Sequence, residues 1–346
     1  MTMNSELILF LLQDALTNGA IYGLLAIAIV LVFSVTRVLF IPQGEFVVFG
    51  AFTMASIQSG QVPGLLWLVI VMGALEVIAD LVAAGRRKKR VSMKLLGLKA
   101  LWPIAVAGLL FALPLADLPI SVQALLTIAV ILPMGSQLYR LFYQPLAAAS
   151  PLILLTVSIA VHVALVSLSL LIFGPNGAQT KPFTDSATSI LGMAVGGQTV
   201  WVLAVSILLV LAMYGFFELT LFGKALRATA LNRTGARLVG ISPQFSSSLA
   251  FSVAGLIGAS SGILIAPITT LYYDSGLLIA LKGFVGAVIG AMTGYPLAAA
   301  GALIVGLLES FSAFWASTYK EVIVFTLLIP VLLWRSRHAL REEDHS

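Results

Sequence analysis

Cysteine is absent from the 346-residue chain, which excludes disulfide bonds and metal sites built from thiolates. Only three histidines are present, so we expect no metal centre built from imidazoles either. Charge is also scarce, because 10% of the residues are Asp, Glu, Lys or Arg, against about a quarter in an ordinary soluble domain. This composition argues against an ordinary soluble protein, and no pattern typical of nucleic-acid binding occurs.

Motifs of common enzyme classes are missing as well. The segment FGKALR contains the Gly-Lys pair of a phosphate-binding loop, but Glu218 stands where that motif begins with Gly and Ala225 where it ends with Ser or Thr. Neither a G-x-S-x-G elbow nor an H-E-x-x-H helix occurs. We therefore expect no enzyme activity and no cofactor in this chain. If it works with ATP, the nucleotide must bind to another subunit.

Apolar residues are abundant instead: they form 60% of the chain, and the mean hydropathy is +1.07. Uncharged runs of about 18 or more residues are typical of membrane-spanning helices. Candidate spans cover residues 7–35, 44–58, 65–84, 101–117, 121–139, 151–173, 199–219, 246–268, 277–292, 296–314 and 321–334. The sequence predicts an all-α polytopic membrane protein, a single domain over 1–346 with about nine to eleven transmembrane helices, some of them broken or part-length.

Basic residues predict how the helices are oriented. They cluster at 86–90 (RRKKR), at Arg140, within 223–241, and at Arg335, Arg337 and Arg341. Counting spans between the clusters places all four on one side, which the positive-inside rule assigns to the cytoplasm. The N-terminus is then predicted to lie outside and the C-terminus inside.

The segment from Gly223 to Ile241 holds four basic residues and no acid. On a helical wheel, Lys224 and Arg227 fall nearly opposite Arg233 and Arg237, so no single apolar face emerges. A short helix, a turn and a second short helix therefore fit better than one amphipathic helix on the membrane surface. This folded element suits docking into another protein; a solvated positive loop is the alternative.

Ionisable residues inside predicted spans are costly and are candidates for function. Lys282 must reach the membrane surface, pair with an acid or face water. Glu309 lies near the end of its span, where a surface role competes with a lining role. Pro42 and Gly44 precede Glu45 and predict a break between the first two helices, and broken helices at membrane depth line cavities.

Other polar and small residues have simpler interpretations. Glu76 and Asp80 lie four residues apart on one helix face, just before the basic run at 86–90. An ion pair with basic residues at the cytoplasmic end of their helix explains them. For the isolated His162, packing is favoured over a proton relay. Glycines spaced four apart predict close helix packing. They are Gly19 and Gly23, Gly258 and Gly262, and Gly286, Gly290 and Gly294.

Several stretches share motifs with one family of membrane proteins. Residues 16–26 (LTNGAIYGLLA) match L-x-x-G-x-x-Y-x-L-x-A, residues 40–46 (FIPQGEF) follow N-F-A-H-G-E-F, and YQPL and TVSI occupy 143–146 and 156–159. Residues 223–241 match G-R-A-x-R-A-x-x-x-N-x-x-x-A-x-x-x-G-I, with Lys224 in place of the first Arg. The last motif is matched by Leu281, Lys282, Phe284, Gly290, Gly294, Pro296, Gly301, Gly306 and Glu309. Over about 1–60 and 121–335, the chain thereby resembles the permeases of branched-chain amino-acid ABC importers.

The resemblance implies a permease of a bacterial inner-membrane importer that moves a branched-chain amino acid, or a similar amino acid, amide or urea, by alternating access. The partners it implies are separate ATP-binding subunits, a second permease chain, identical or different, a solute-binding protein and membrane lipid. It implies coupling to the ATPase through Gly223, Lys224, Arg227, Asn232, Arg233, Arg237 and Gly240. Candidates for the translocation pathway are Gln43, Gly44, Glu45, Thr156, Lys282 and Glu309.

The chain departs from the family pattern in two places. Gln43 stands where the family has His and Phe40 where it has Asn. Residues 65–117 do not align and are interpreted as an inserted helical hairpin with a basic cytoplasmic loop.

Two other classes of function remain as alternatives: a secondary transporter coupled to H⁺ or Na⁺, which needs buried acids in mid-span, and a membrane-embedded enzyme or assembly factor.

Overall fold

The computed structural model describes residues 5–87, 93–190, 193–290, 292 and 294–333. These residues are mostly helical, with one short β-hairpin formed by β1 (Ala187–Ile190) and β2 (Met193–Gly196). The helices are α1 Ser5–Thr36, α2 Gln43–Gln58, α3 Leu65–Arg87, α4 Met93–Ala112, α5 Ile120–Leu138, α6 Pro151–Phe173, α7 Gly197–Leu219, α8 Leu221–Leu231, α9 Arg233–Leu238, α10 Pro243–Ile265, α11 Gly276–Ile289, α12 Tyr295–Ala316 and α13 Lys320–Thr326.

The prediction of an all-α polytopic membrane protein is confirmed. Within the described residues, seven helical segments are long and apolar enough to cross a membrane. They are Glu6–Thr36, Leu65–Gly85, Ile120–Leu146, Pro151–Phe173, Gly197–Leu219, Pro243–Ile265 and Tyr295–Leu333. The predicted segments 44–58 and 277–292 fall on the shorter helices α2 and α11. The last two predicted spans fall within Tyr295–Leu333, where a 3₁₀ turn at Ser317–Tyr319 separates α12 from α13.

Two predicted boundaries differ from the structure because of proline. The span predicted at 101–117 ends as an α-helix at Ala112, and a separate 3₁₀ turn follows at Leu115–Asp117. Pro114 lacks a backbone donor and disfavours helical backbone at the residue before it. The span predicted to begin at 246 begins at Pro243, at a first-turn position that tolerates proline, after Ser242, whose hydroxyl accepts a hydrogen bond from the Phe245 N–H.

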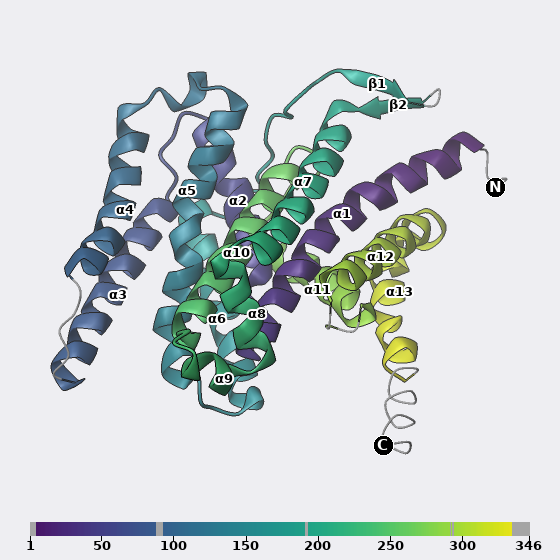
Figure 1. The fold of residues 1–346 in the computed structure, drawn as a ribbon. Helices are drawn as coiled ribbons and strands as arrows, with labels where there is room; N and C mark the ends of the chain where they lie inside the picture. The colour runs from purple at the N-terminus through teal and green to yellow at the C-terminus, as the bar shows by residue number, and fades with distance from the viewer. Residues whose placement is uncertain (1–4, 88–92, 191–192, 291, 293, 334–346) are drawn as a thin grey trace, which may run out of the picture.

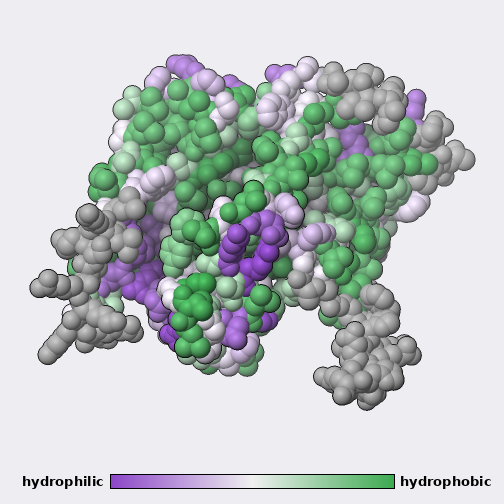
Figure 2. Space-filling model, viewed as in Figure 1, coloured by the Kyte–Doolittle hydropathy of each residue, from purple (hydrophilic) through white to green (hydrophobic). Residues whose placement is uncertain are grey.

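Figure 1 shows the arrangement of the helices. The α3–α4 hairpin lies at one side of the bundle next to α5, while α12 and α13 lie at the other side. The β-hairpin lies at one end of the bundle, and α8 and α9 lie at the opposite end, together with the end of α3. In Figure 2, apolar residues cover most of the visible face, as expected for a surface in contact with lipid. The hydrophilic residues on this face form groups in its middle and lower parts, around α8, α9 and the lower end of α3, and smaller groups along its upper edge.

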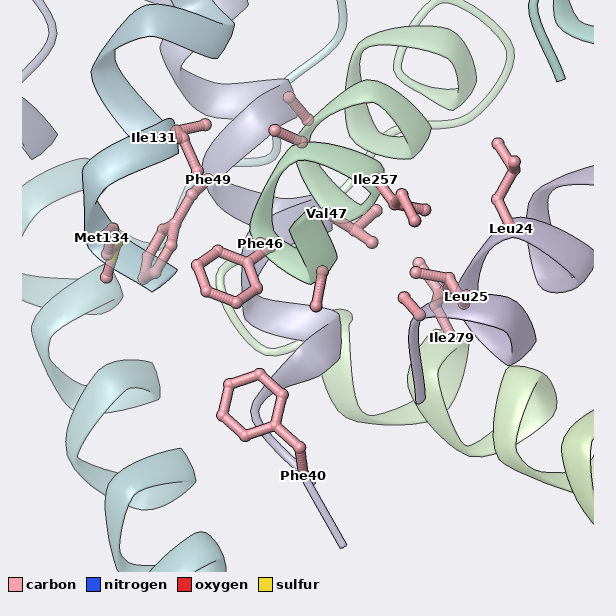
Figure 3. Close-up of a cluster of buried hydrophobic side chains, with 14 of the residues drawn as sticks. Leu24, Leu25, Phe40, Phe46, Val47, Phe49, Ile131, Met134, Ile257 and Ile279 are labelled. Atoms are coloured by element: carbon pink, nitrogen blue, oxygen red, sulfur yellow. The ribbon is translucent and has the colours of Figure 1, made fainter. Parts of the chain in front are cut away.

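The core surrounds α2, which is buried over almost its whole length between α1, α5, α10 and α11. Figure 3 shows Phe46, Val47 and Phe49 of α2 close to Ile257 of α10 and Met134 of α5. Phe40 lies on the extended segment just before α2, and its ring centroid is 5.9 Å from that of Phe46 and 4.7 Å from that of Phe251. The buried aromatic rings thus hold a non-helical segment inside the bundle.

Glycines allow these helices to approach closely, as their spacing predicts. A Cβ added to Gly262 would lie 2.0 Å from the Val47 carbonyl oxygen of α2, and one added to Gly286 would lie 2.6 Å from the Ala302 Cα of α12. Gly290 packs against α12 in the same way, and Gly19 and Gly23 pack against it from α1. Gly294 differs, because it is the residue preceding α12 and has an extended backbone. The α2–α10, α11–α12 and α1–α12 contacts therefore depend on backbone proximity.

Candidate translocation and coupling sites

The predicted break between the first two helices is present. The α1 helix ends at Thr36, and Arg37 adopts a left-handed backbone with φ of 60°, which ends the helix and redirects the chain. The chain then returns without helical structure until α2 begins at Gln43, directly after Pro42. The side chain of Gln43 donates a hydrogen bond of 2.9 Å to the Ala254 carbonyl of α10, so this amide anchors the start of α2.

The start of α2 meets the start of α11 inside the bundle. A Cβ on Gly44 would lie 1.8 Å from the Gly276 carbonyl oxygen, and a Cβ on Gly276 would lie 2.8 Å from the Gly44 carbonyl carbon. Only glycines permit this contact. The first N–H groups of a helix have no partner within it, and its dipole is positive there. Two helix N-termini that meet within a membrane protein favour a negatively charged group between them.

Glu45 occupies this position and is 1% exposed. Its Oε1 lies 3.1 Å from Nδ1 of His162 on α6, and 2.8 Å from the point where a Cβ on Gly276 would stand. Among the described residues, neither carboxylate oxygen of Glu45 receives a hydrogen bond of good geometry. His162, interpreted from the sequence as a packing residue, is therefore next to a buried acid, a pairing that nothing in the sequence indicates.

An apolar cavity of about 150 Å³ lies beside the non-helical segment and the first turns of α11. It is lined by Ile29, Leu39, Phe40, Ile41, Leu155, Leu277, Ala280, Leu281 and Phe284. Phe40 stands at a position where the chain departs from the family motif, and it contributes an aromatic wall. A cavity with this lining accommodates a small aliphatic group better than a polar one.

Lys282 and Glu309, also predicted for the pathway, form a second cluster. The Lys282 ammonium donates to Oε1 of Glu309 at 2.6 Å and to Oε1 of Glu321 at 3.0 Å, and it lies 5.7 Å from the centre of the Tyr22 ring. Lys282 and Glu309 are both buried. The cluster joins α1, α11, α12 and α13, so Lys282 pairs with acids instead of reaching the membrane surface. Glu321 was not predicted as a member.

Thr156 lies apart from both groups. It is on an exposed face of α6, and its hydroxyl donates to the Leu152 carbonyl of the same helix. The structure thus brings Gln43, Gly44 and Glu45 together at the start of α2, and Lys282 together with Glu309.

The basic segment 223–241 forms the predicted helix, turn and helix, as α8 and α9. Thr220 caps α8 by accepting a hydrogen bond from the Gly223 N–H, and Asn232 ends α8 and caps α9 by accepting one from Gly235. Gly240 follows α9 with φ of 86°, a backbone that favours glycine. Leu226 is buried on the inner side of the element, where the Thr229 hydroxyl lies 3.0 Å from that of Ser246 on α10.

The outer side of this element presents apolar and basic side chains together. Leu231 and Leu238 are each 84% exposed, and Arg233 and Arg237 line a groove of about 560 Å³ next to α9. Arg227 does not belong to this groove, because it forms an exposed ion pair with Glu218 that raises the pKa of its guanidinium further above its ordinary value. Within the described residues, Arg233 and Arg237 form no ion pair. Exposed leucines beside such arginines are typical of a docking surface for a protein that carries acids.

The ion pair predicted near the end of α3 is confirmed and is larger than expected. Lys99 of α4 pairs with both Glu76 and Asp80, at 2.6 and 2.8 Å, and Arg140 also binds Asp80. This network attaches the α3–α4 hairpin to the end of α5. The rest of the basic run after α3, residues 88–90, and the basic residues after 334 lie outside the described residues. The interpretation of 65–117 as an insertion stays a prediction.

Broken helices that meet around a cavity, within a bundle of membrane-spanning helices, define a multi-pass membrane protein of the transporter class. The chain belongs to the family described as branched-chain amino acid transport system / permease component, whose model matches residues 11–332. It is 26% identical over 348 residues to the high-affinity branched-chain amino acid transport system permease protein LivH of Escherichia coli K12, covering 96% of this chain and 95% of that protein. LivH of Salmonella typhimurium is 24% identical with the same coverage.

A further relative is the permease protein BraD of Pseudomonas aeruginosa, which is 26% identical over 237 residues, covering 66% of this chain and 77% of that protein. No solved structure matches the chain. The family resemblance read from the sequence motifs is therefore confirmed.

Proposed function

We propose that this chain is the membrane-spanning permease subunit of an ATP-driven importer of branched-chain amino acids. ATP would bind to separate subunits at the cytoplasmic face, and a solute-binding protein would deliver the amino acid from outside. The second permease of the complex would be a homologous or an identical chain. The relatives are named as branched-chain amino acid permeases, and the apolar cavity beside α11 suits an aliphatic side chain.

The observation that carries the coupling assignment is the outer side of the α8–α9 element. Caps at Thr220 and Asn232 fix its shape, and Leu231, Leu238, Arg233 and Arg237 face outward. Closure of the ATP-binding subunits would push this element and, through its packing on α10, rock the helices between outward-open and inward-open states. The orientation follows from the same feature: α8 and α9 lie on the cytoplasmic side, the N-terminus outside and the C-terminus inside.

The test replaces Arg233 and Arg237 by Glu and Gly240 by Val, and measures co-purification with the ATP-binding subunits of the same transport system. Reversed charge should repel the acids of the ATPase, and Val cannot adopt the backbone of Gly240 without strain. We expect loss of assembly and of ATPase stimulation. Lys181→Glu, on the exposed connection between α6 and β1, serves as the matched control and should assemble normally. Full assembly and stimulation of the first variant would overturn the coupling assignment.

An ion-coupled secondary transporter is the second candidate. Glu45 and Glu309 are both buried, which is what that mechanism needs of its acids. Uptake that proceeds with a Na⁺ or proton gradient and without ATP would favour it over the importer.

A further inference from the structure

We propose that the Glu45 carboxylate binds the ammonium group of the transported amino acid, with His162 holding the carboxylate while the site is empty. This inference rests on the proposed function and adds a residue that recognises the part of the substrate that all amino acids share. The juxtaposition that carries it is a buried carboxylate that accepts no hydrogen bond of good geometry from the described residues, two helix N-termini and an apolar cavity.

The first step concerns the charge of Glu45. Its carboxylate lies in the first turn of α2 and against Gly276, the first residue of α11. Helix N-termini stabilise a negative charge, and here two of them act on one carboxylate. The two helix ends offset part of the cost of holding a negative charge on a side chain that is 1% exposed. An ionised carboxylate at membrane depth then requires a positively charged partner.

The second step concerns the partner. Within the described part of the chain, no Lys or Arg forms an ion pair with Glu45, and His162 is the basic side chain in contact with it. The Nδ1–Oε1 distance is 3.1 Å, but the geometry is not that of a hydrogen bond, and Oε2 is equally without a donor. Asp274, an exposed residue two positions before α11, is a further acid near the start of that helix. The carboxylate can therefore accept one cation and at least two hydrogen-bond donors, and an ammonium group supplies both.

The third step concerns the remainder of the substrate. The cavity is lined by Ala280, and a Cβ on Gly44, the residue before Glu45, would lie 3.0 Å from the Ala280 Cβ. Gly44 thus contacts a residue of the cavity wall, while the Glu45 carboxylate itself is not among the lining groups. In the proposed binding mode, an amino acid with its ammonium group at Glu45 would extend its aliphatic side chain past Ala280 toward the cavity residues Phe40, Leu277 and Leu281.

The alternative is that Glu45 and His162 form a structural link between α2 and α6. The two readings differ in the expected effect of each partner. A structural link needs both side chains equally, whereas an ammonium site needs Glu45 and tolerates the loss of His162. They also differ in ATP use, because a permease that has lost its substrate contact still responds to the loaded binding protein.

The experiment uses the complete transporter in proteoliposomes, with radiolabelled leucine, saturating binding protein and ATP inside. Glu45→Gln is expected to lower leucine uptake about ten- to a hundredfold, the effect of losing a hydrogen bond to a charged group. ATP hydrolysis stimulated by the loaded binding protein should persist, so the ATP consumed per leucine rises. His162→Gln should keep most of the uptake. Asp117→Asn, an exposed acid outside the cavity, is the matched control and should behave as wild type.

Three results would overturn the proposal. The first is an unchanged ATP-to-leucine ratio in Glu45→Gln, and the second is an equal loss of uptake and ATPase activity in Glu45→Gln and His162→Gln. The third is wild-type uptake that depends on a Na⁺ or proton gradient and loses this dependence in Glu45→Gln. Should Glu45→Gln fail to assemble, Glu45→Asp decides, because the displaced carboxylate should still raise the ratio. A wild-type complex that imports no leucine with ATP would instead contradict the proposed function, independently of Glu45.

Discussion

The Lys282 cluster and the Glu45 pair both bury carboxylates between helices of the bundle, but their partners differ. In the Lys282 cluster, one ammonium donates hydrogen bonds to two carboxylates and lies near the ring of Tyr22. In the Glu45 pair, the carboxylate has an imidazole beside it and accepts no hydrogen bond of good geometry within the described residues. In the Lys282 cluster each carboxylate is paired with the ammonium through Oε1, while Oε2 of Glu309 and of Glu321 receives no hydrogen bond from the described residues. Glu45 differs in that neither of its oxygens has a lysine or arginine partner within the described residues, which leaves both available to a ligand.

The surroundings of the two sites follow the same contrast. Lys282 joins four helices, α1, α11, α12 and α13, and its part of α11 packs on α12 through Gly286 and Gly290. Glu45 lies where two helices begin, and its partner His162 is on α6, a helix that exposes most of its length. We infer that the Lys282 cluster stabilises the bundle, while the start of α2 is the part suited to exchange partners during transport.

The largest effect is expected from Lys282→Met, which removes the cation and leaves Glu309 buried and unpaired. Breaking a buried ion pair by removing one partner costs about 3–5 kcal/mol. We expect a large fall in the thermal unfolding midpoint of the detergent-solubilised protein. Lys181→Met, which changes an exposed lysine, is the control and should leave the midpoint unchanged.

The double variant Lys282→Met/Glu309→Gln sharpens this test, because it removes the unpaired charge together with its partner. Part of the lost stability should return. If Lys282→Met alone unfolds at the wild-type midpoint, the cluster does not stabilise the bundle and the contrast with Glu45 disappears.

A smaller effect is expected from Glu321→Gln. The Glu321 side chain is 34% exposed, and its removal leaves the Lys282–Glu309 pair in place. The loss should be about 1 kcal/mol, the scale of a partly solvated ion pair. It should appear as a modest shift of the unfolding midpoint, together with earlier proteolysis in α13, which this contact attaches to α11. A shift as large as that of Lys282→Met would mean that α13 is central to the bundle.

Much of the fold could be predicted from the sequence, because each membrane-spanning helix corresponds to one continuous run of apolar, uncharged residues. Uncharged apolar runs located the long helices, and Pro42 with Gly44 located the break before α2. The division of residues 223–241 into two short helices was predicted because these residues, placed on one continuous helix, form no single apolar face. The C-terminal end of α4 and the start of α10 were wrong by a few residues, because Pro114 and the cap at Ser242 outweigh hydropathy there. The start of α4, predicted at 101, lies at Met93, because the helix extends beyond the apolar run into a segment that contains lysines.

The sites were predicted less completely, because pairing depends on how distant helices assemble. Lys282, Glu309 and Glu45 could each be recognised as costly at membrane depth. Their partners Glu321 and His162 could not be recognised in this way. An acid at the end of a predicted span and an isolated histidine are both explained by a surface position or by packing, without any functional role. The two glycines that let α2 and α11 meet are likewise ordinary in sequence and become specific only through the backbone contact.

The smallest effect on stability is expected from Glu45→Gln, the variant that should be among the most damaging to transport. Glu45 accepts no hydrogen bond of good geometry from the part of the chain that the structure describes, so the change removes none there, and the neutral amide no longer carries a buried charge. The stabilisation of that charge by the two helix N-termini is lost in return, so the net change should be within about 1 kcal/mol of zero. The unfolding midpoint of the solubilised protein should therefore stay near that of the wild type. A fall comparable to that of Lys282→Met would show that the Glu45–His162 pair holds α2 and α6 together, and the two sites would then be built alike.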